Sequence, residues 1–83
     1  MSQQLEVLLF AGIREALGRD TLSVRLESGA CVADLLALLA AEHPEIASRL
    51  GSLGVAVNQT LAPPATPLRE GDEVALIPPL GGG

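Results

Sequence analysis

Short apolar segments with the length and composition of β-strands occur near both ends of the chain and in its second half. The clearest pattern lies in residues 21–26, where apolar and polar residues alternate at period two, as in a strand with one buried face. We predict strands at residues 5–10, 21–26, 55–57 and 73–77. Gly12 is expected to end the first strand, and the second strand to pair with the first as a hairpin.

The apolar residues between the second and third strands follow a helical period instead. They have the i, i+3, i+4, i+7 spacing of an amphipathic helix, at Val32, Leu35, Leu36 and Leu39. Pro44 is expected to end this helix near His43, and residues 45–50 to form a further short helical turn. Another short helical turn, residues 13–17, is expected before Gly18 in the connection between the first two strands.

Turn-forming residues divide the rest of the chain. Asn58-Gln59 favours a tight turn that leads into a short return strand at Thr60-Leu61. Residues 62–67 contain three prolines, which lack the backbone N–H that a ladder needs, so this segment is predicted to be a sheet edge or a loop. A turn at residues 70–72 leads into the last strand.

The order strand, strand, helix, strand, short strand, strand predicts an α+β fold of the β-grasp type, a mixed sheet of 4–5 strands packed on one main helix. The first and last strands are expected to lie parallel at the sheet centre, with the helix in the crossover. With 83 residues the chain forms one small domain. We expect this domain at residues 1–78 and a flexible tail at residues 79–83.

Side-chain alternation in the first and last strands predicts an exposed apolar patch beside the tail. Glu6 and Phe10 share one face of the first strand, and Glu73 and Ile77 share one face of the last. If the strands are parallel neighbours, this face runs from the two glutamates to Phe10 and Ile77. Phe10 is the only aromatic residue, and we expect it to contact a partner; the alternative is that the proline-rich loop covers it.

Composition narrows the classes of partner and compartment. Ten acidic residues against five arginines, with no lysine, give a net charge of −5 and argue against a nucleic-acid partner. The single cysteine fits a reducing cytosol, and the N-terminal residues lack a secretory pattern. Because no apolar run is long enough to cross a bilayer, we expect a cytoplasmic protein without a membrane partner. A chain this short rarely encloses a deep pocket, which favours a carrier, adaptor or subunit over a self-sufficient enzyme.

The C-terminal residues Leu80-Gly81-Gly82-Gly83 point to function rather than to stability. Glycines cost conformational entropy on ordering and offer no side chain to pack. A glycine backbone can enter a slot too narrow for a Cβ atom, and it leaves the terminal carboxylate open to attack. We therefore expect this tail to be the functional segment.

Three motifs resemble the small subunit of molybdopterin synthase, the MoaD type of sulfur carrier in the MoaD/ThiS family. They are Leu9-Phe10-Ala11-x-x-Arg14-Glu15, the hairpin Val57-Asn58-Gln59-x-Leu61, and Pro67-Leu68-x-x-Gly71-Asp72-Glu73-Val74 followed by Pro78-Pro79-x-x-Gly82-Gly83. The resemblance covers nearly the full length. A terminal diglycine alone is shared with thiamine sulfur carriers and ubiquitin-like modifiers, whereas the paired prolines and the first-strand motif are more specific. One departure is Gly81, where many relatives have a larger residue, so we expect a more flexible tail.

The resemblance implies a ubiquitin-like β-grasp fold and a sulfur-carrier role in molybdenum cofactor synthesis. It implies that an E1-like adenylyltransferase uses MgATP to convert the Gly83 carboxylate to an acyl-adenylate, and that sulfur from a sulfurtransferase then gives a thiocarboxylate. The segment Pro78, Pro79, Leu80, Gly81 and Gly82 would insert with Gly83 into the large subunit, where the sulfur is transferred to cyclic pyranopterin monophosphate. This chain is expected to bind no cofactor or metal, with the catalytic side chains on the large subunit of a heterotetramer.

The resemblance further implies a partner interface of Phe10, Leu61 and Ile77, in agreement with the alternation argument for Phe10 and Ile77. It gives Arg14 a structural or interface role. The other arginines form no run and are expected to be solvated surface charges.

Three other residue groups are expected to be structural. Cys31 precedes the helix and is interpreted as a cap or buried residue rather than a sulfur relay. His43 has no second ligand at metal spacing. Asp72 and Glu73 are strand neighbours that point to opposite faces, so they make a poor acid/base pair.

Three other functions are compatible with the sequence. One alternative is a sulfur carrier for thiamine or cysteine synthesis. Another is a ubiquitin-like modifier, in which Gly83 forms an isopeptide bond with a target lysine. The third is a β-grasp adaptor that binds without covalent chemistry.

Overall fold

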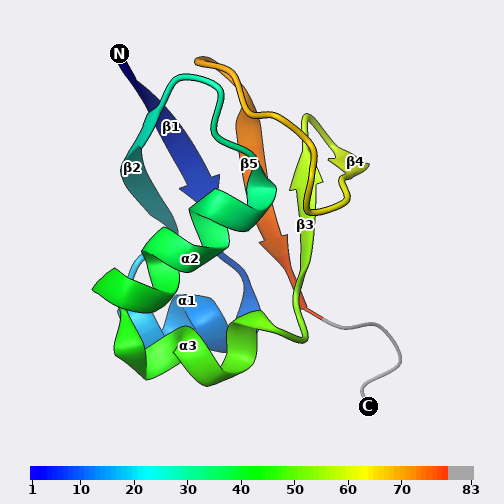
Figure 1. Ribbon diagram of the computed structural model, residues 1–83. Coiled ribbons are helices and arrows are strands. Elements are labelled where there is room, and N and C mark those ends of the chain that lie inside the picture. The colour runs from blue at the N-terminus through cyan, green and yellow to red at the C-terminus, as the bar shows by residue number, and fades with distance from the viewer. Residues whose placement is uncertain (79–83) are drawn as a thin grey trace.

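The computed structural model describes residues 1–78 as one sheet covered by helices (Figure 1). Its strands are β1 (Ser2–Leu8), β2 (Thr21–Glu27), β3 (Gly54–Val57), β4 (Thr60–Leu61) and β5 (Glu73–Ile77). Its helices are α1 (Ala11–Leu17), α2 (Val32–Glu42) and α3 (Pro44–Leu50). The predicted helix, both helical turns and the short return strand are therefore confirmed.

The strands are ordered β2-β1-β5-β3-β4, so the last strand lies at the centre of the sheet. β1 pairs in parallel with β5, with Glu6 opposite Glu73 and Leu8 opposite Ala75. The other neighbouring pairs are antiparallel. Helix α2 crosses one face of the sheet, and α1 and α3 lie together near the end toward which β1 and β5 run (Figure 1). This is the predicted β-grasp arrangement.

One hydrophobic core lies between the sheet and the helices. The inward half of the alternation predicted for the central strands is confirmed, because Leu5, Val7, Val74 and Leu76 are all almost fully buried. The outward half is only partly confirmed, because Ala75, between the exposed Glu73 and the partly buried Ile77, is buried as well. The helices contribute Val32, Leu35, Leu39 and Ile46, and the loop before β5 contributes Leu68. Leu36, which the helical pattern assigned to the same face, is only partly buried and packs at the margin of the core.

The first strand differs from its prediction at both ends, since β1 runs from Ser2 to Leu8 instead of from residue 5 to residue 10. It starts earlier because Gln3, although polar, is buried and donates from Nε2 to the Leu68 carbonyl at 2.9 Å. It ends earlier because Phe10 is the N-cap of α1, and Ala11 adopts a left-handed φ of 49° that turns the chain. Phe10 therefore lies just beyond the strand.

The turn at Asn58-Gln59 is confirmed, with φ values of 52° and 72° at its two central residues, as a type I′ hairpin requires. Asn58 also reaches β5, because its Nδ2 donates to Asp72 Oδ1 and its Oδ1 accepts from the Glu73 N–H, each at 3.0 Å. Asp72 Oδ2 accepts from the Arg69 N–H at 2.8 Å. The predicted turn at residues 70–72 is thus joined to the β3–β4 hairpin.

Candidate functional site

The parallel pairing of β1 and β5 brings two distant segments to one edge of the sheet. Parallel strands end at the same edge, so Phe10, after β1, and Pro78, after β5, line one common pocket. Pro78 is the last residue that the structure describes, and the predicted tail residues Pro79, Leu80, Gly81, Gly82 and Gly83 lie outside the described residues. The described chain therefore ends, at Pro78, beside Phe10.

Three apolar residues of this edge form what we call the tail-side apolar surface: Phe10, Leu61 and Ile77. Phe10 is 42% exposed and Leu61 is 70% exposed, while Ile77 is partly buried. Leu61 and Ile77 meet above Gly54, because Leu61 Cδ2 and Ile77 Cβ lie 3.5 and 3.9 Å from the position that a Cβ on residue 54 would occupy. The predicted exposure of Phe10 is confirmed, whereas contact with a partner stays a prediction.

The sheet face opposite the helices continues this surface inward. Strand register aligns Leu8, Ala75, Ala56 and Leu61 in one row across four strands. Glu6 and Glu73 are neighbours one step earlier in the parallel pair, and both are exposed. The face is therefore acidic at one end and apolar toward the exit of the C-terminal segment.

A small pocket of about 180 Å³ lies beside the tail-side apolar surface, and we call it the Arg49 pocket. Its lining includes Phe10, Gly12, Ile13, Leu53 and Pro78 around Arg49. The Arg49 guanidinium donates from Nη1 to the Gly12 carbonyl at 3.1 Å and so joins α3 to α1. Sequence reasoning treated Arg49 only as a surface charge. No local pattern identifies this contact, because 37 positions separate the two residues.

Arg14, the other arginine near this edge, has a local partner. Its Nε lies 3.7 Å from Asp20 Oδ1, and both side chains are mostly exposed. Arg14 is absent from the residues that line the Arg49 pocket. Its interface role stays a prediction.

Cys31 and His43, which the sequence analysis interpreted as structural residues, both lie at helix ends. Cys31 is the N-cap of α2, and its N–H and Sγ contact Asp34 Oδ2 at 2.9 and 3.4 Å, which confirms the interpretation as a cap. Two hydrogen bonds from Cys31 lower the pKa of the Asp34 carboxyl. The bond from the Cys31 backbone has the larger effect, and the bond from its side chain the smaller. His43 joins α2 to α3, and residues 1–78 contain no cluster of three potential metal ligands.

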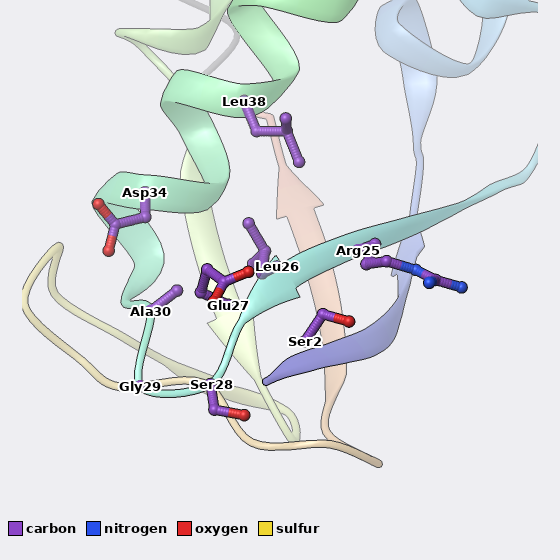
Figure 2. Close-up of a pocket in the computed structure, with 9 residues that line it drawn as sticks. All are labelled: Ser2, Arg25, Leu26, Glu27, Ser28, Gly29, Ala30, Asp34 and Leu38. Atoms are coloured by element: carbon purple, nitrogen blue, oxygen red, sulfur yellow. The ribbon is translucent and has the colours of Figure 1, made fainter.

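A larger hollow of about 850 Å³ lies at the opposite end of β1 (Figure 2). Its lining includes Ser2, Arg25 and Leu26 of the sheet and Asp34 and Leu38 of α2, and the Arg25 side chain points away from α2 (Figure 2). Asp34 is already engaged with Cys31, and Glu27, also in the lining, lies 3.7 Å from the N-terminal amine. These carboxylates are used within the fold, so the tail-side edge is the stronger candidate site.

Among the helices of the described residues, none has the length and apolar character needed to cross a membrane.

Comparison with known proteins gives close matches over most of the chain. A model described as the ThiS family matches residues 7–83. The molybdopterin synthase sulfur carrier subunit of Chlamydomonas reinhardtii is 43% identical over 82 residues, which cover 96% of this chain and 99% of that protein. The subunit of the same name from Escherichia coli strain K12 is 42% identical over 81 residues, covering 95% and 99%.

Solved structures are similar as well. The crystal structure of small archaeal modifier protein 1 from Haloferax volcanii gives a TM-score of 0.86 at 31% identity, covering 94% of this chain and 99% of that one. A chain in the complex of subunits 1 and 2 of the molybdopterin-converting factor from Helicobacter pylori gives 0.72 at 28% identity, covering 98% and 100%. A ubiquitin from Caldiarchaeum subterraneum, at 14% identity and a TM-score of 0.67 over the full length of both chains, shows that the fold is ubiquitin-like.

Proposed function

The chain belongs to the ThiS family, and from this premise we propose that it is a sulfur carrier and the small subunit of a molybdopterin synthase. One structural observation carries the proposal. The tail-side apolar surface lies at the same sheet edge as Pro78, so a partner that docks on Phe10, Leu61 and Ile77 meets the C-terminal segment directly. Similarity to sulfur carrier subunits over almost the whole chain supports the same reading.

The proposed chemistry takes place at the carboxyl carbon of Gly83. A carboxylate is a poor electrophile, so an E1-like adenylyltransferase joins it to AMP from MgATP and releases pyrophosphate. A persulfide, supplied by a sulfurtransferase, displaces AMP, and a thiol then cleaves the sulfur–sulfur bond to leave the thiocarboxylate. In the large subunit its sulfur is transferred to cyclic pyranopterin monophosphate, and two such transfers build the dithiolene.

The five residues 79–83 give the carrier its reach. Fully extended, they span at most about 17 Å, enough to carry Gly83 from the domain edge into a neighbouring subunit. The fixed φ of Pro78 and Pro79 limits the freedom lost when the segment inserts, and the glycines admit a narrow channel.

The partners provide what this small domain lacks. In residues 1–78, the Asp72 carboxylate accepts hydrogen bonds in a turn and the Asp34 carboxylate accepts them in a helix cap. In the proposed scheme the catalytic side chains belong to the large subunit and the nucleotide site to the adenylyltransferase. The Helicobacter pylori complex of subunits 1 and 2 supports a large-subunit partner. The working assembly that we propose is a heterotetramer. These reactions, together with the free thiol of Cys31, fit a cytoplasmic setting.

A second candidate function is protein modification, favoured by the similarity to small archaeal modifier protein 1. In that case Gly83 forms an isopeptide bond with a lysine of a target protein. The chain contains no lysine, so it offers no side-chain amine for attaching a second copy of itself.

Intact-mass spectrometry tests the proposal directly. The purified chain is incubated with the E1-like enzyme, MgATP and a sulfurtransferase with its sulfur source. A carrier gains the mass of one oxygen-to-sulfur exchange, and addition of the large subunit and cyclic pyranopterin monophosphate then yields molybdopterin. A chain lacking residues 82–83 serves as the matched control and gains nothing.

The other outcomes assign the alternatives. Loading without molybdopterin formation indicates a carrier for another pathway, such as thiamine or cysteine synthesis. Conjugates of high mass on lysines of other proteins indicate a modifier. If neither product forms, the result contradicts the proposal, and a non-covalent adaptor is the function that remains.

A further inference from the structure

Arg49 lies where the proposed docking surface and the exit of the C-terminal segment meet. Phe10 belongs to both the tail-side apolar surface and the Arg49 pocket, and Pro78 lines the same pocket. A partner that covers Phe10 and receives the segment after Pro78 therefore also covers Arg49. The pocket is continuous with the proposed interface.

The charge of Arg49 is not neutralised within the described part of the chain. Among residues 1–78, no carboxylate oxygen lies within 4.0 Å of its guanidinium, whereas Arg14 is paired with Asp20. Within the described residues Arg19, Arg25 and Arg69 also have no carboxylate partner, so Arg49 differs from them by its position beside the tail-side apolar surface. An acidic group on a partner is the electrostatic complement of this position.

The guanidinium is also held in place before any partner arrives. Nη1 donates to the Gly12 carbonyl at 3.1 Å. The hydrogen bond to Gly12 uses one of the five N–H donors of the arginine, and the remaining donors belong to the planar fork that binds carboxylates in a bidentate way. Because the Arg49 side chain is already anchored, less conformational entropy is lost when a partner binds it.

We propose that the Arg49 pocket binds a carboxylate side chain of the protein that receives the C-terminal segment. This inference rests on the proposed function and specifies the chemistry of that partner. The pocket volume of about 180 Å³ suits a single side chain, and Phe10, Leu53 and Pro78 line it beside the exposed Arg49, so that a docked partner would exclude water from the ion pair. Shielding strengthens the pair, because charge-assisted hydrogen bonds gain strength where water is excluded. The partner thus presents an aspartate or glutamate next to the apolar residues that cover Phe10.

The test measures the dissociation constant of the full chain for the large subunit of molybdopterin synthase at several salt concentrations. Arg49→Glu is expected to weaken binding by at least about tenfold, because it sets two like charges against each other. Arg49→Gln is expected to weaken it by roughly fivefold and to flatten its salt dependence. Arg25→Glu and Arg25→Gln, which make the same charge changes at the far hollow, are matched controls and stay within about twofold of the wild type.

Thermal unfolding of each variant separates loss of binding from loss of fold. If Arg49→Glu unfolds, Arg49→Gln carries the test, since it removes the charge without adding a repulsive one. Equal affinities for the Arg49 and Arg25 variants overturn this inference and leave the proposed function standing. A wild-type chain that does not bind the large subunit at all overturns both.

Discussion

Asn58 donates from Nδ2 to Oδ1 of Asp72 at 3.0 Å and thereby ties the β3–β4 turn to the residue before β5. The same side chain accepts from the Glu73 N–H, and its backbone has a positive φ of 52°. Asn58→Ala removes both hydrogen bonds and places an unfavourable residue in a left-handed conformation. We expect it to lower the free energy of unfolding by about 1–2 kcal/mol in urea denaturation.

Asn58→Gly separates the two causes, because glycine tolerates the positive φ and lacks only the hydrogen bonds. Its loss should be smaller than that of Asn58→Ala. Equal stability of the alanine variant and the wild type would show that the bridge contributes nothing.

Ala11 is a non-glycine residue with a left-handed φ of 49°, directly after Phe10. Its Cβ makes this conformation costly, and glycine removes that cost at the expense of a more flexible unfolded chain. Ala11→Gly should therefore raise the free energy of unfolding by about 0.5 kcal/mol. Ala16→Gly, an exposed position later in α1, is the control and should lower it by about 0.5–1 kcal/mol. Destabilisation by both substitutions would contradict the assignment of strain to Ala11.

Asp34 makes the stability of the α2 N-terminus depend on pH. Hydrogen bonds from Cys31 lower the pKa of this carboxyl, so the folded state favours the ionised form. The stabilisation is present above the pKa of the unfolded chain and is lost as the pH falls through the lowered pKa. Asp34→Asn keeps an oxygen acceptor but removes the charge. Its melting temperature should lie below that of the wild type at neutral pH, and the gap should close in acid; a constant gap would argue against the linkage.

Leu61 is the most exposed member of the tail-side apolar surface, and its truncation costs the folded domain little. Leu61→Asp places a charge where the proposed partner is apolar and should weaken binding to the large subunit by about tenfold or more. Ala37→Asp adds the same charge on an exposed position of α2 and is the matched control. Binding is compared by titration calorimetry, after circular dichroism has shown that both variants are folded. Equal losses in the two variants would exclude this surface as the docking site.

Much of this fold could be predicted because the signals are local. The period-two pattern of β2, the helical spacing from Val32 to Leu39 and the turn at Asn58-Gln59 each need only a few neighbouring residues. The parallel β1–β5 pair followed from topology rules. Phe10 is exposed as predicted, although it lies beyond β1 as the N-cap of α1 and not on the strand whose alternation the prediction used.

The predictions are wrong or incomplete where a contact with a residue far away in the sequence determines the structure. Gln3 extends β1 because its amide finds the Leu68 carbonyl, 65 positions away. Arg49 enters the candidate site because Gly12 accepts its hydrogen bond from another helix. Neither pair lies within one short stretch of the sequence. The start of β1 and the position of Arg49 beside Pro78 could therefore not be predicted from local pattern.

The central position of β5 has a consequence for how the protein is made. β5 separates β1 from β3, and Glu6 of β1 lies 67 positions before its partner Glu73, so neither neighbour of β5 can complete its pairing until residues 73–77 have left the ribosome. Contacts this distant in sequence also form late in folding. A chain that terminates early, before β5, leaves the sheet in two halves with open edges, a target for proteolysis. Completion of the sheet, and with it of the tail-side apolar surface, therefore requires translation through Ile77.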